Sequence, residues 1–347
     1  MRRVRVMRGK GITYDTGFID TGLIDAGPST REPFDPDLVK REMRVIREDL
    51  HCNAVRITGG DPDRLEIAAI HAADAGLEVW FSPFTCDLTT GELLTFLADC
   101  AERAERLRRR GAEVVLVTGA ELTLFTKGFL PGDTLADRLA LLAEPHRLRE
   151  VMPRVPALLD DFLAKAVNVV RDRFGGRVTY AALPSEQIDW TPFDFVSADA
   201  YTSIEVADRY TEAIRSLVAL GKPVAITEFG CTTHRGAADL GARGMFMVEW
   251  DGARAIGLKG DYVRDETEQV TYLRDSLDVF TAEGVDTAFW CTFASYNLPH
   301  RDDPREDFDM ASYGLVKVLE DRPGHTYPDM PWEPKAAFDA LAECYRS

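Results

Sequence analysis

Eight short runs rich in apolar and β-branched residues recur along the chain, and longer amphipathic segments separate most of them. This alternation limits the fold more than any other feature, because strands that alternate with helices form parallel sheets with helical crossovers. The eight runs are Gly11–Phe18, Cys52–Thr58, Leu77–Phe84, Glu113–Gly119, Val178–Leu183, Phe193–Ala198, Pro223–Thr227 and Asp286–Thr292.

Helix signals lie between these runs. Asp35–Pro36 and Asp61–Pro62 each combine an N-cap residue with a proline suited to the first helical turn. The fifth and sixth runs are so close that only a very short helix fits between them. Further helices are expected at Thr90–Gly111, Val155–Arg173, Val206–Leu220, Glu266–Thr281 and Trp332–Tyr345.

The pattern predicts an α/β fold, a (β/α)₈ TIM barrel formed by residues 1–347 as a single domain. A barrel needs about 250 residues, so the surplus of this 347-residue chain is expected in enlarged loops after strands four, seven and eight. A doubly wound open sheet is the alternative, but Gly59 and Gly60 after the second run do not match the GxGxxG fingerprint. The surplus segments are Leu122–Arg154, Phe229–Arg264 and Ser295–Pro331.

The charge balance disfavours several partners. The chain carries 41 Lys and Arg against 58 Asp and Glu, a formal net charge of −17, so nucleic acid and anionic lipid would repel it. No apolar run approaches the length of about 20 residues that spans a bilayer. The basic start, MRRVRVMRGKG, lacks the apolar core of a secretory signal. We therefore expect a soluble, cytoplasmic protein without nucleic-acid or membrane partners, and the sequence leaves its oligomeric state open.

Cysteine usage does not indicate a metal site. The six cysteines are scattered and form no CxxC pair, so buried free thiols are expected rather than a zinc site or a disulfide framework. Small-residue packing is the favoured interpretation of Cys231 and Cys291, which fall near strand ends.

Polar residues gather at the predicted carboxyl ends of the strands, where barrel enzymes build their active sites. An inward-facing barrel layer is normally apolar, so carboxylates that converge on one rim need a reason. The candidates in chain order are Asp15, Arg56, Glu121, Glu186, Asp199, Tyr201, Glu228 and Trp290.

Glu121 and Glu228 are the leading pair. Glu228 ends the run KPVAITEFG, and Glu121 lies in VTGAELTLF directly after strand four. Two carboxyl groups facing each other across a barrel mouth suit glycoside hydrolysis, in which one holds a proton for the leaving oxygen and the other stays ionised. Taken alone, either residue could have a purely structural role, as an ion pair at a strand end or as a charged residue at the start of a loop.

These features together resemble the superfamily of retaining (β/α)₈ glycosidases often called clan A. The resemblance implies that Glu121 is the acid/base and Glu228 the nucleophile. It further implies that Arg56 and Tyr201 hydrogen-bond to Glu228, and that Trp290 forms the floor of the sugar subsite. The segments EQVTYLRDSLDVFTAEGVDTAFWCTF and WEPKAAFDAL are also similar to the last helices and strand of that superfamily.

One position departs from the superfamily's pattern. Ala120 stands where an Asn that binds the sugar 2-hydroxyl usually precedes the acid/base. Hydrogen bonds to that hydroxyl supply several kcal/mol in the transition state, so an unusual sugar, a changed reaction or an inactive relative are all open. We expect a small glycoside or sugar-containing metabolite as substrate, with Asp15, Glu186 and Asp199 as further substrate contacts and no cofactor or metal.

Two other functions compete with glycoside hydrolysis. The first is a non-hydrolytic barrel: either an enzyme of specialised metabolism that uses the carboxylates for proton transfer, or a carbohydrate-binding protein. The second is a metal-dependent sugar isomerase or epimerase, with Glu186, Asp199, Glu228 and a His as ligands. The sequence ranks the isomerase lower, because strand eight offers no carboxylate and no HxH or DxH pair occurs.

Overall fold

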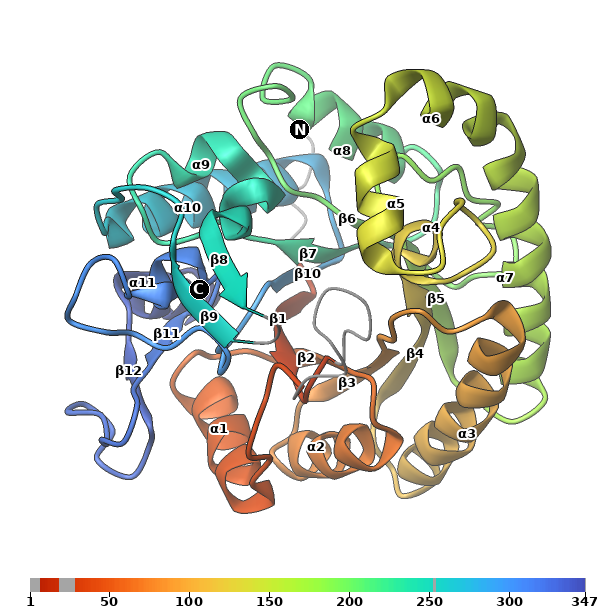
Figure 1. The fold of residues 1–347 in the computed structure, drawn as a ribbon. Helices are drawn as coiled ribbons and strands as arrows, with labels where there is room; N and C mark the ends of the chain where they lie inside the picture. The colour runs from red at the N-terminus through yellow and green to blue at the C-terminus, as the bar shows by residue number, and fades with distance from the viewer. Residues whose placement is uncertain (1–6, 19–28, 252–253, 347) are drawn as a thin grey trace.

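The computed structural model describes residues 7–18, 29–251 and 254–346 of the chain. Within them, eight parallel strands lie side by side in the order β5-β4-β3-β2-β1-β10-β7-β6, with helices around the outside (Figure 1). The strands are β1 (Gly9–Asp15), β2 (Ala54–Gly59), β3 (Glu78–Pro83), β4 (Val114–Ala120), β5 (Arg177–Ala181), β6 (Val196–Asp199), β7 (Val224–Phe229) and β10 (Thr287–Trp290).

Hydrogen bonds between the two outermost strands of that order close the sheet. The amide of Asp194 donates to the carbonyl of Val178 (2.9 Å), and the amide of Asp199 donates to the carbonyl of Ala182 (2.9 Å). The sheet is therefore a closed (β/α)₈ barrel, and the predicted fold class is confirmed. The open doubly wound sheet is excluded.

The outer helices begin where the sequence predicts. Asp35 and Asp61 are N-caps whose carboxylates accept hydrogen bonds from Asp37 and Asp63, and a proline follows each cap. Thr89 forms a capping box with Glu92, which stabilises a helix start by about 1 kcal/mol. The helices between barrel strands are α1 (Pro36–Glu48), α2 (Pro62–Asp74), α3 (Thr90–Arg109), α7 (Val155–Arg171), α8 (Tyr210–Val218) and α10 (Glu266–Glu283), and α11 (Ala336–Arg346) follows β12.

Aromatic rings fill the barrel below the strand ends. Trp80, Phe195 and Phe289 come from three different parts of the sheet, and the Trp80 ring centroid lies 4.9 Å from each of the other two. Small residues, among them Ala54 and Ala225, complete this cluster. The interior is thus a packed apolar plug, and it leaves the carboxyl ends of the strands as the place for polar chemistry.

The three surplus segments contain their own short elements. The segment after β4 forms α4 (Leu122–Phe125), α5 (Leu135–Leu142), α6 (Pro145–Val151) and the 3₁₀ helix η1 (Met152–Arg154). The segment after β7 forms α9 (Ala237–Leu240), the 3₁₀ helix η2 (Gly241–Met247), and an antiparallel hairpin of β8 (Val248–Asp251) and β9 (Arg254–Leu258). The segment after β10 contains the 3₁₀ helix η3 (Phe308–Ala311) and β11 (Val316–Val318).

Several sequence-based boundaries are wrong, among them that of strand six, which begins at Val196 rather than Phe193. Residues 332–334 are not the start of the last helix but β12 (Trp332–Pro334), which pairs with β11, because the Trp332 ring is buried against Phe293 and Tyr327. The helix expected from Val206 begins only at Tyr210. The first strand ends at Asp15 rather than Phe18, since Asp15 binds the amide of Gly17 and turns the chain.

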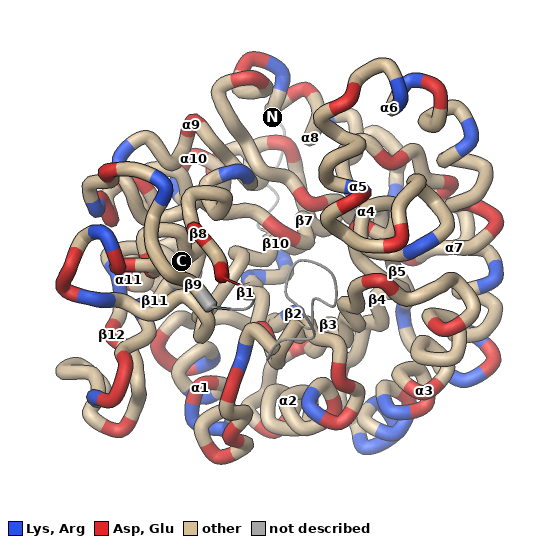
Figure 2. The backbone as a smooth tube through the Cα atoms, viewed as in Figure 1, with Lys and Arg blue, Asp and Glu red and all other residues tan. Residues whose placement is uncertain are grey.

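Lys and Arg are interspersed with Asp and Glu over the outer helices (Figure 2). Many form ion pairs, such as Arg103 with Glu66 at 2.7 Å. None of the helices in the described residues is both long and apolar enough to cross a bilayer. The expectation based on MRRVRVMRGKG rests partly on residues 1–6, which lie outside the described residues.

Candidate active site

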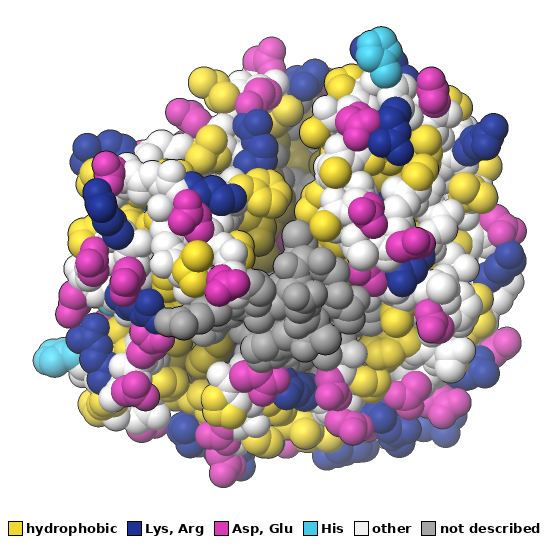
Figure 3. Space-filling view, in the orientation of Figure 1, with side chains coloured by type: hydrophobic (Ala, Val, Ile, Leu, Met, Phe, Trp, Pro, Cys, Tyr) yellow, Lys and Arg dark blue, Asp and Glu magenta, His cyan; other side chains and the backbone are white. Residues whose placement is uncertain are grey.

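The carboxyl ends of the barrel strands face the viewer in Figures 1 and 3. The space-filling view shows a groove on this face that runs alongside α5 and α6 (Figure 3). Hydrophobic side chains lie on the walls of that groove (Figure 3).

Glu228 lies near the end of β7 with both carboxylate oxygens engaged. Arg56 Nη1 donates to one oxygen at 2.6 Å, and the Tyr201 hydroxyl donates to the other at 2.8 Å. Only 13% of the Glu228 side chain is exposed. These two donors come from β2 and from the loop after β6, so Glu228 is held in one orientation by distant parts of the chain.

Arg56 is fully buried and fixed at several atoms. Its Nε donates to the Ser82 hydroxyl at 3.1 Å, and its Nη1 also donates to the carbonyl of Thr227 at 3.1 Å. Burial acts to lower the pKa of Arg56, but the negative charges of Glu228 and Asp199 outweigh it and raise that pKa. Arg56 is therefore a permanent cation that compensates the charge of Glu228.

Tyr201 remains a hydrogen-bond donor for the same physical reason. Burial raises the pKa of its phenol well above the usual value, and the neighbouring Cys291 and Glu228 raise it further. The ring packs edge-on against Tyr313 with centroids 5.8 Å apart. The protonated hydroxyl is thus kept pointing at Glu228.

Cys291 is a neighbour of the site to which sequence reasoning gave only a packing role. Its thiol is within hydrogen-bonding reach of the Tyr201 hydroxyl, and burial together with the charge of Glu228 raises its pKa well above the usual value. The thiol is therefore neutral. Gly230, at φ +158°, passes so close that a Cβ there would lie 2.7 Å from the Cys291 carbonyl oxygen, which explains the glycine that ends ITEFG.

Glu121 has an unusual backbone conformation. It follows β4 directly, caps α4, and adopts φ 48° and ψ 40°, a left-handed conformation that costs a non-glycine residue about 1–2 kcal/mol. Its amide donates to the carbonyl of Ala181 on β5 at 2.9 Å. Strain of this kind at a strand end is typical of functional sites.

Electrostatic coupling connects Glu121 with the groups on β6 and β7. Burial raises the pKa of Glu121 well above its usual value, and the carboxylates of Asp199 and Glu228 raise it further. Burial and the charge of Glu228 likewise raise the pKa of Asp199 to about 8. Both carboxyl groups therefore favour the protonated form more than an exposed carboxyl does, whereas Glu228 is paired with Arg56.

Asp199 is the least satisfied polar group at the strand ends. It is 1% exposed and lies beside Glu228 in the β6–β7 register. Neither of its carboxyl oxygens makes a hydrogen bond of good geometry with the described residues, and the nearby Thr227 hydroxyl acts only to lower the pKa of Asp199 against the larger effect of burial. A buried carboxyl without well-formed hydrogen bonds is expensive to ionise, which agrees with its raised pKa.

Trp290 does not form an accessible sugar platform, and this prediction is wrong. Its side chain is 0% exposed, and its indole N–H donates to the carbonyl of Tyr313 at 2.9 Å. The rings of Phe229 and Tyr272 pack against it edge-on. Trp290 is a core residue behind the site.

Glu186 and Asp15 hold loops in place instead of presenting free oxygens. Glu186 accepts four hydrogen bonds, from the Thr123 amide and hydroxyl, the Tyr180 hydroxyl and the Leu183 amide, at 2.6–3.0 Å. The Asp15 carboxylate accepts from the Gly17 amide and the Thr30 hydroxyl. The expected contacts of these two carboxylates with substrate are not available in this arrangement.

Ala120 faces the apolar plug. It is 2% exposed and belongs to the cluster that contains Trp80, Val117 and Phe289. An alanine in this setting offers no hydrogen-bond donor, so nothing at this position replaces the amide that normally binds the sugar 2-hydroxyl.

The residues predicted as metal ligands of an isomerase do not come together around one point in the described part of the chain. Glu186 is saturated, His234 contacts the carbonyl of Arg235, and His300 contacts Asp307. No three His, Cys, Asp or Glu side chains in residues 7–18, 29–251 and 254–346 are grouped as ligands for one metal ion.

Comparison with solved structures places this fold among glycoside hydrolases. A GH113 β-1,4-mannanase has a TM-score of 0.60 and 16% identity over 99% of this chain and 100% of that one. A GH113 β-mannanase from Alicyclobacillus acidocaldarius has a TM-score of 0.56 and 18% identity, covering 99% and 98% of the two chains. A family 1 β-glucosidase from Thermotoga maritima has a TM-score of 0.53 and 11% identity, covering 100% and 99%.

The predicted resemblance is thus confirmed at the level of the fold, at sequence identities of 11–18%. No protein-family model matches the sequence, and no curated protein matches it. The class of protein defined here is a (β/α)₈ barrel with the fold of glycoside hydrolases. The reaction has to be argued from the side chains themselves.

Proposed function

We propose that this protein is a glycoside hydrolase that acts by a retaining mechanism on a small glycoside, with the described chain as one catalytic domain. Glu228, as the carboxylate paired with Arg56, attacks the anomeric carbon, and the bond to the leaving oxygen breaks as Glu121 gives that oxygen its proton. Water then attacks the glycosyl ester, Glu121 takes the proton of the water, and Glu228 is released as the carboxylate.

The observation that carries this proposal is the difference between the two glutamates. Glu228 receives hydrogen bonds from Arg56 and Tyr201. Glu121 receives none from the described residues, and its pKa is raised by burial and by neighbouring carboxylates. A pair of titratable groups whose surroundings separate their protonation states identifies the nucleophile and the acid.

The proposed substrate is a small sugar-containing molecule rather than a polysaccharide. The solved structures of similar fold are described as mannanases and a β-glucosidase, so mannosides and glucosides form the first substrate panel. Because Ala120 cannot hydrogen-bond to the sugar 2-hydroxyl, we expect the enzyme to discriminate less between sugars that differ at carbon 2.

The experiment is covalent trapping. The protein is incubated with 2-deoxy-2-fluoro mannosides and glucosides that carry an activated leaving group, and peptide mass spectrometry locates the label. We expect one glycosyl ester, on Glu228, and none on Glu228→Gln. A label at a different residue in a protein that turns over the parent glycoside would refute the proposal.

A non-hydrolytic relative is the second candidate, and the apolar surroundings of Ala120 favour it. Such a protein would use Glu121 and Asp199 for proton transfer or would bind sugar without cleaving it. Saturable binding of a mannoside or glucoside by calorimetry, with neither trapping nor release of the leaving group, would select this candidate over the hydrolase.

A further inference from the structure

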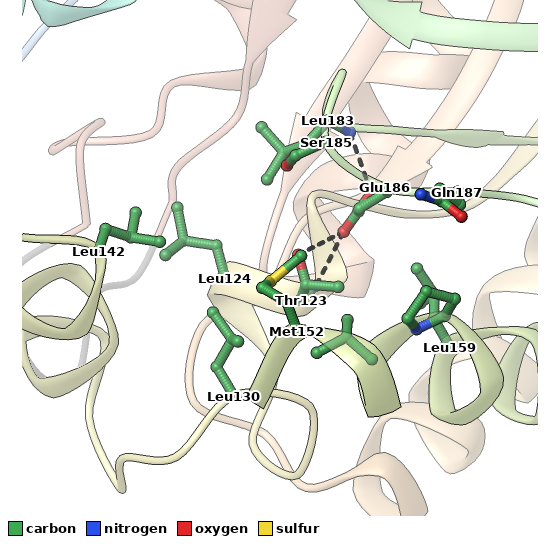
Figure 4. A pocket seen from close by; sticks show the side chains of 12 residues that line it. Thr123, Leu124, Leu130, Leu142, Met152, Leu159, Leu183, Ser185, Glu186 and Gln187 are labelled. Atoms are coloured by element: carbon green, nitrogen blue, oxygen red, sulfur yellow. Dashed lines mark hydrogen bonds between the residues drawn. The ribbon is translucent and has the colours of Figure 1, made fainter. Parts of the chain in front are cut away.

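A cavity lies near the acid/base candidate. It has a volume of about 220 Å³ and is enclosed by α4, α5, η1, α7 and the loop after β5 (Figure 4). Most of its wall is hydrocarbon. The apolar lining residues are Leu124, Leu130, Leu142, Met152, Val155, Pro156, Leu159 and Leu183.

The carboxylate of this cavity, Glu186, is already fully hydrogen-bonded to neighbouring protein groups. Glu186 uses both oxygens on four donors, and two of those donors are the amide and hydroxyl of Thr123 (Figure 4). Ser185 and Gln187 are exposed residues of the same lining. A hydroxyl-rich sugar would exchange its water for few new hydrogen bonds here, which is unfavourable.

Hydrogen bonds tie the segment that directly follows Glu121 to the Glu186 carboxylate of the cavity wall. The Leu122 amide, next to Glu121, donates to the Tyr180 hydroxyl at 2.9 Å, and that hydroxyl donates to Glu186 at 2.7 Å. Thr123, two residues after Glu121, lines the cavity. None of the described lining residues comes from β7, the strand of Glu228. The cavity is therefore built on the segment that follows Glu121 and not on the strand of Glu228.

We propose that this cavity receives an apolar, non-sugar leaving group of the glycoside, such as an aryl or medium-length alkyl group. The inference rests on the proposed function, because an acid must lie next to the glycosidic oxygen and the leaving group extends from that oxygen. The size fits, since an apolar cavity of about 150 Å³ already binds benzene. The enzyme would then release an apolar alcohol or phenol from its sugar.

Leu142 and Leu158 provide a matched pair for the test. Both leucines are 46% exposed, but Leu142 lines the cavity and Leu158, on α7, does not. Leu142→Ser, alone and combined with Met152→Ser, makes the wall polar, and Leu158→Ser is the control. Thermal unfolding of each variant checks that the fold is intact.

The first measurement is turnover of methyl, butyl, hexyl and octyl mannosides and glucosides. We expect kcat/KM to rise about threefold to fourfold for each buried methylene until the cavity is full. This rise should be reduced several-fold by the Leu142→Ser/Met152→Ser change and kept in Leu158→Ser. A flat series in an enzyme whose Glu228 is trapped would overturn the cavity's role and leave the hydrolase standing.

The second measurement needs no catalysis. Calorimetric titration with hexan-1-ol or 4-methylphenol should show saturable binding. The affinity should be lower for the Leu142→Ser/Met152→Ser variant and unchanged for Leu158→Ser. Binding of this kind without turnover of any glycoside supports the apolar site and counts against the hydrolase. Equal binding to the natural protein and the double variant refutes the site.

Discussion

The two halves of the barrel mouth treat a carboxyl group in opposite ways. On the β7 side, Glu228 is clamped between a buried cation and a phenol, at 2.6 and 2.8 Å. On the β4 and β6 sides, the half-buried Glu121 and the buried Asp199 accept no hydrogen bond from a cation or a phenol of the described residues, and burial raises the pKa of both. The same functional group is thus paired with a cation on one side and shifted toward its protonated form on the other, according to its neighbours.

Replacing the clamped carboxylate should have the largest effect. Glu228→Gln keeps the shape of the side chain and removes the proposed nucleophile, so we expect kcat to fall by roughly 10⁴-fold or more. Steady-state kinetics on an aryl glycoside measures it. Retention of a tenth of the natural activity would show that the two sides do not differ as described.

Replacing the proposed acid should have a smaller and substrate-dependent effect. Glu121→Gln should slow cleavage by about 10²- to 10⁴-fold for alkyl leaving groups, because a general acid contributes that much when protonation is needed. For an activated nitrophenyl glycoside the first step should be slowed much less. Equal losses on both substrates would remove Glu121 from the acid role.

The difference between paired and unpaired carboxyl groups can also be tested at Asp199, through the pH dependence of the free energy of unfolding. Its pKa is about 8 in the folded protein against 3.8 as the reference value, so its contribution to stability is full below about pH 4 and is lost as pH rises toward 8. Asp199→Asn cannot ionise, so its free energy of unfolding relative to the natural protein should increase over this window, by a few kcal/mol at about 1.4 kcal/mol per unit.

Urea unfolding at pH 5 and pH 8 measures this difference. Asp208→Asn, an exposed aspartate after β6, serves as the control and should change stability by less than about 0.5 kcal/mol. A difference between Asp199→Asn and the natural protein that is the same at both pH values would contradict the raised pKa.

The smallest effect is expected from the phenol of the clamp. Tyr201→Phe removes one hydrogen bond to a charged oxygen, which is worth about 1.5–3 kcal/mol, so kcat/KM should fall about 10- to 100-fold. Tyr313→Phe is the matched control, because that neighbouring hydroxyl binds the carbonyl of Gly241 rather than Glu228. Equal activity of the two variants would show that Tyr201 does not support the nucleophile.

Local sequence patterns were enough to predict the order of strands and helices in the barrel. Asp35–Pro36 and Asp61–Pro62 start helices as predicted, and Glu121 and Glu228 lie at the ends of β4 and β7. Trp332 shows where local pattern fails. It reads as the start of a helix, but its ring is buried in a tertiary contact and the backbone there forms β12.

The roles of the candidate site residues were predicted less completely, because these roles also depend on tertiary contacts. Glu186, Asp199 and Trp290 all occupy plausible positions at strand ends, yet one is saturated, one lacks well-formed hydrogen bonds and one is inaccessible. Nothing adjacent in sequence distinguishes these outcomes, and the same holds for the thiol of Cys291 beside Tyr201.

The sequence by itself determined the alternation of strands and helices, the barrel, and the two glutamates at its mouth, because capping, periodicity and strand ends are encoded within a few neighbouring residues. Only the tertiary structure decided which carboxyl is paired with Arg56, which has a raised pKa, and where the apolar cavity near Glu121 forms. Burial and hydrogen bonding depend on groups that the fold brings together from distant parts of the chain.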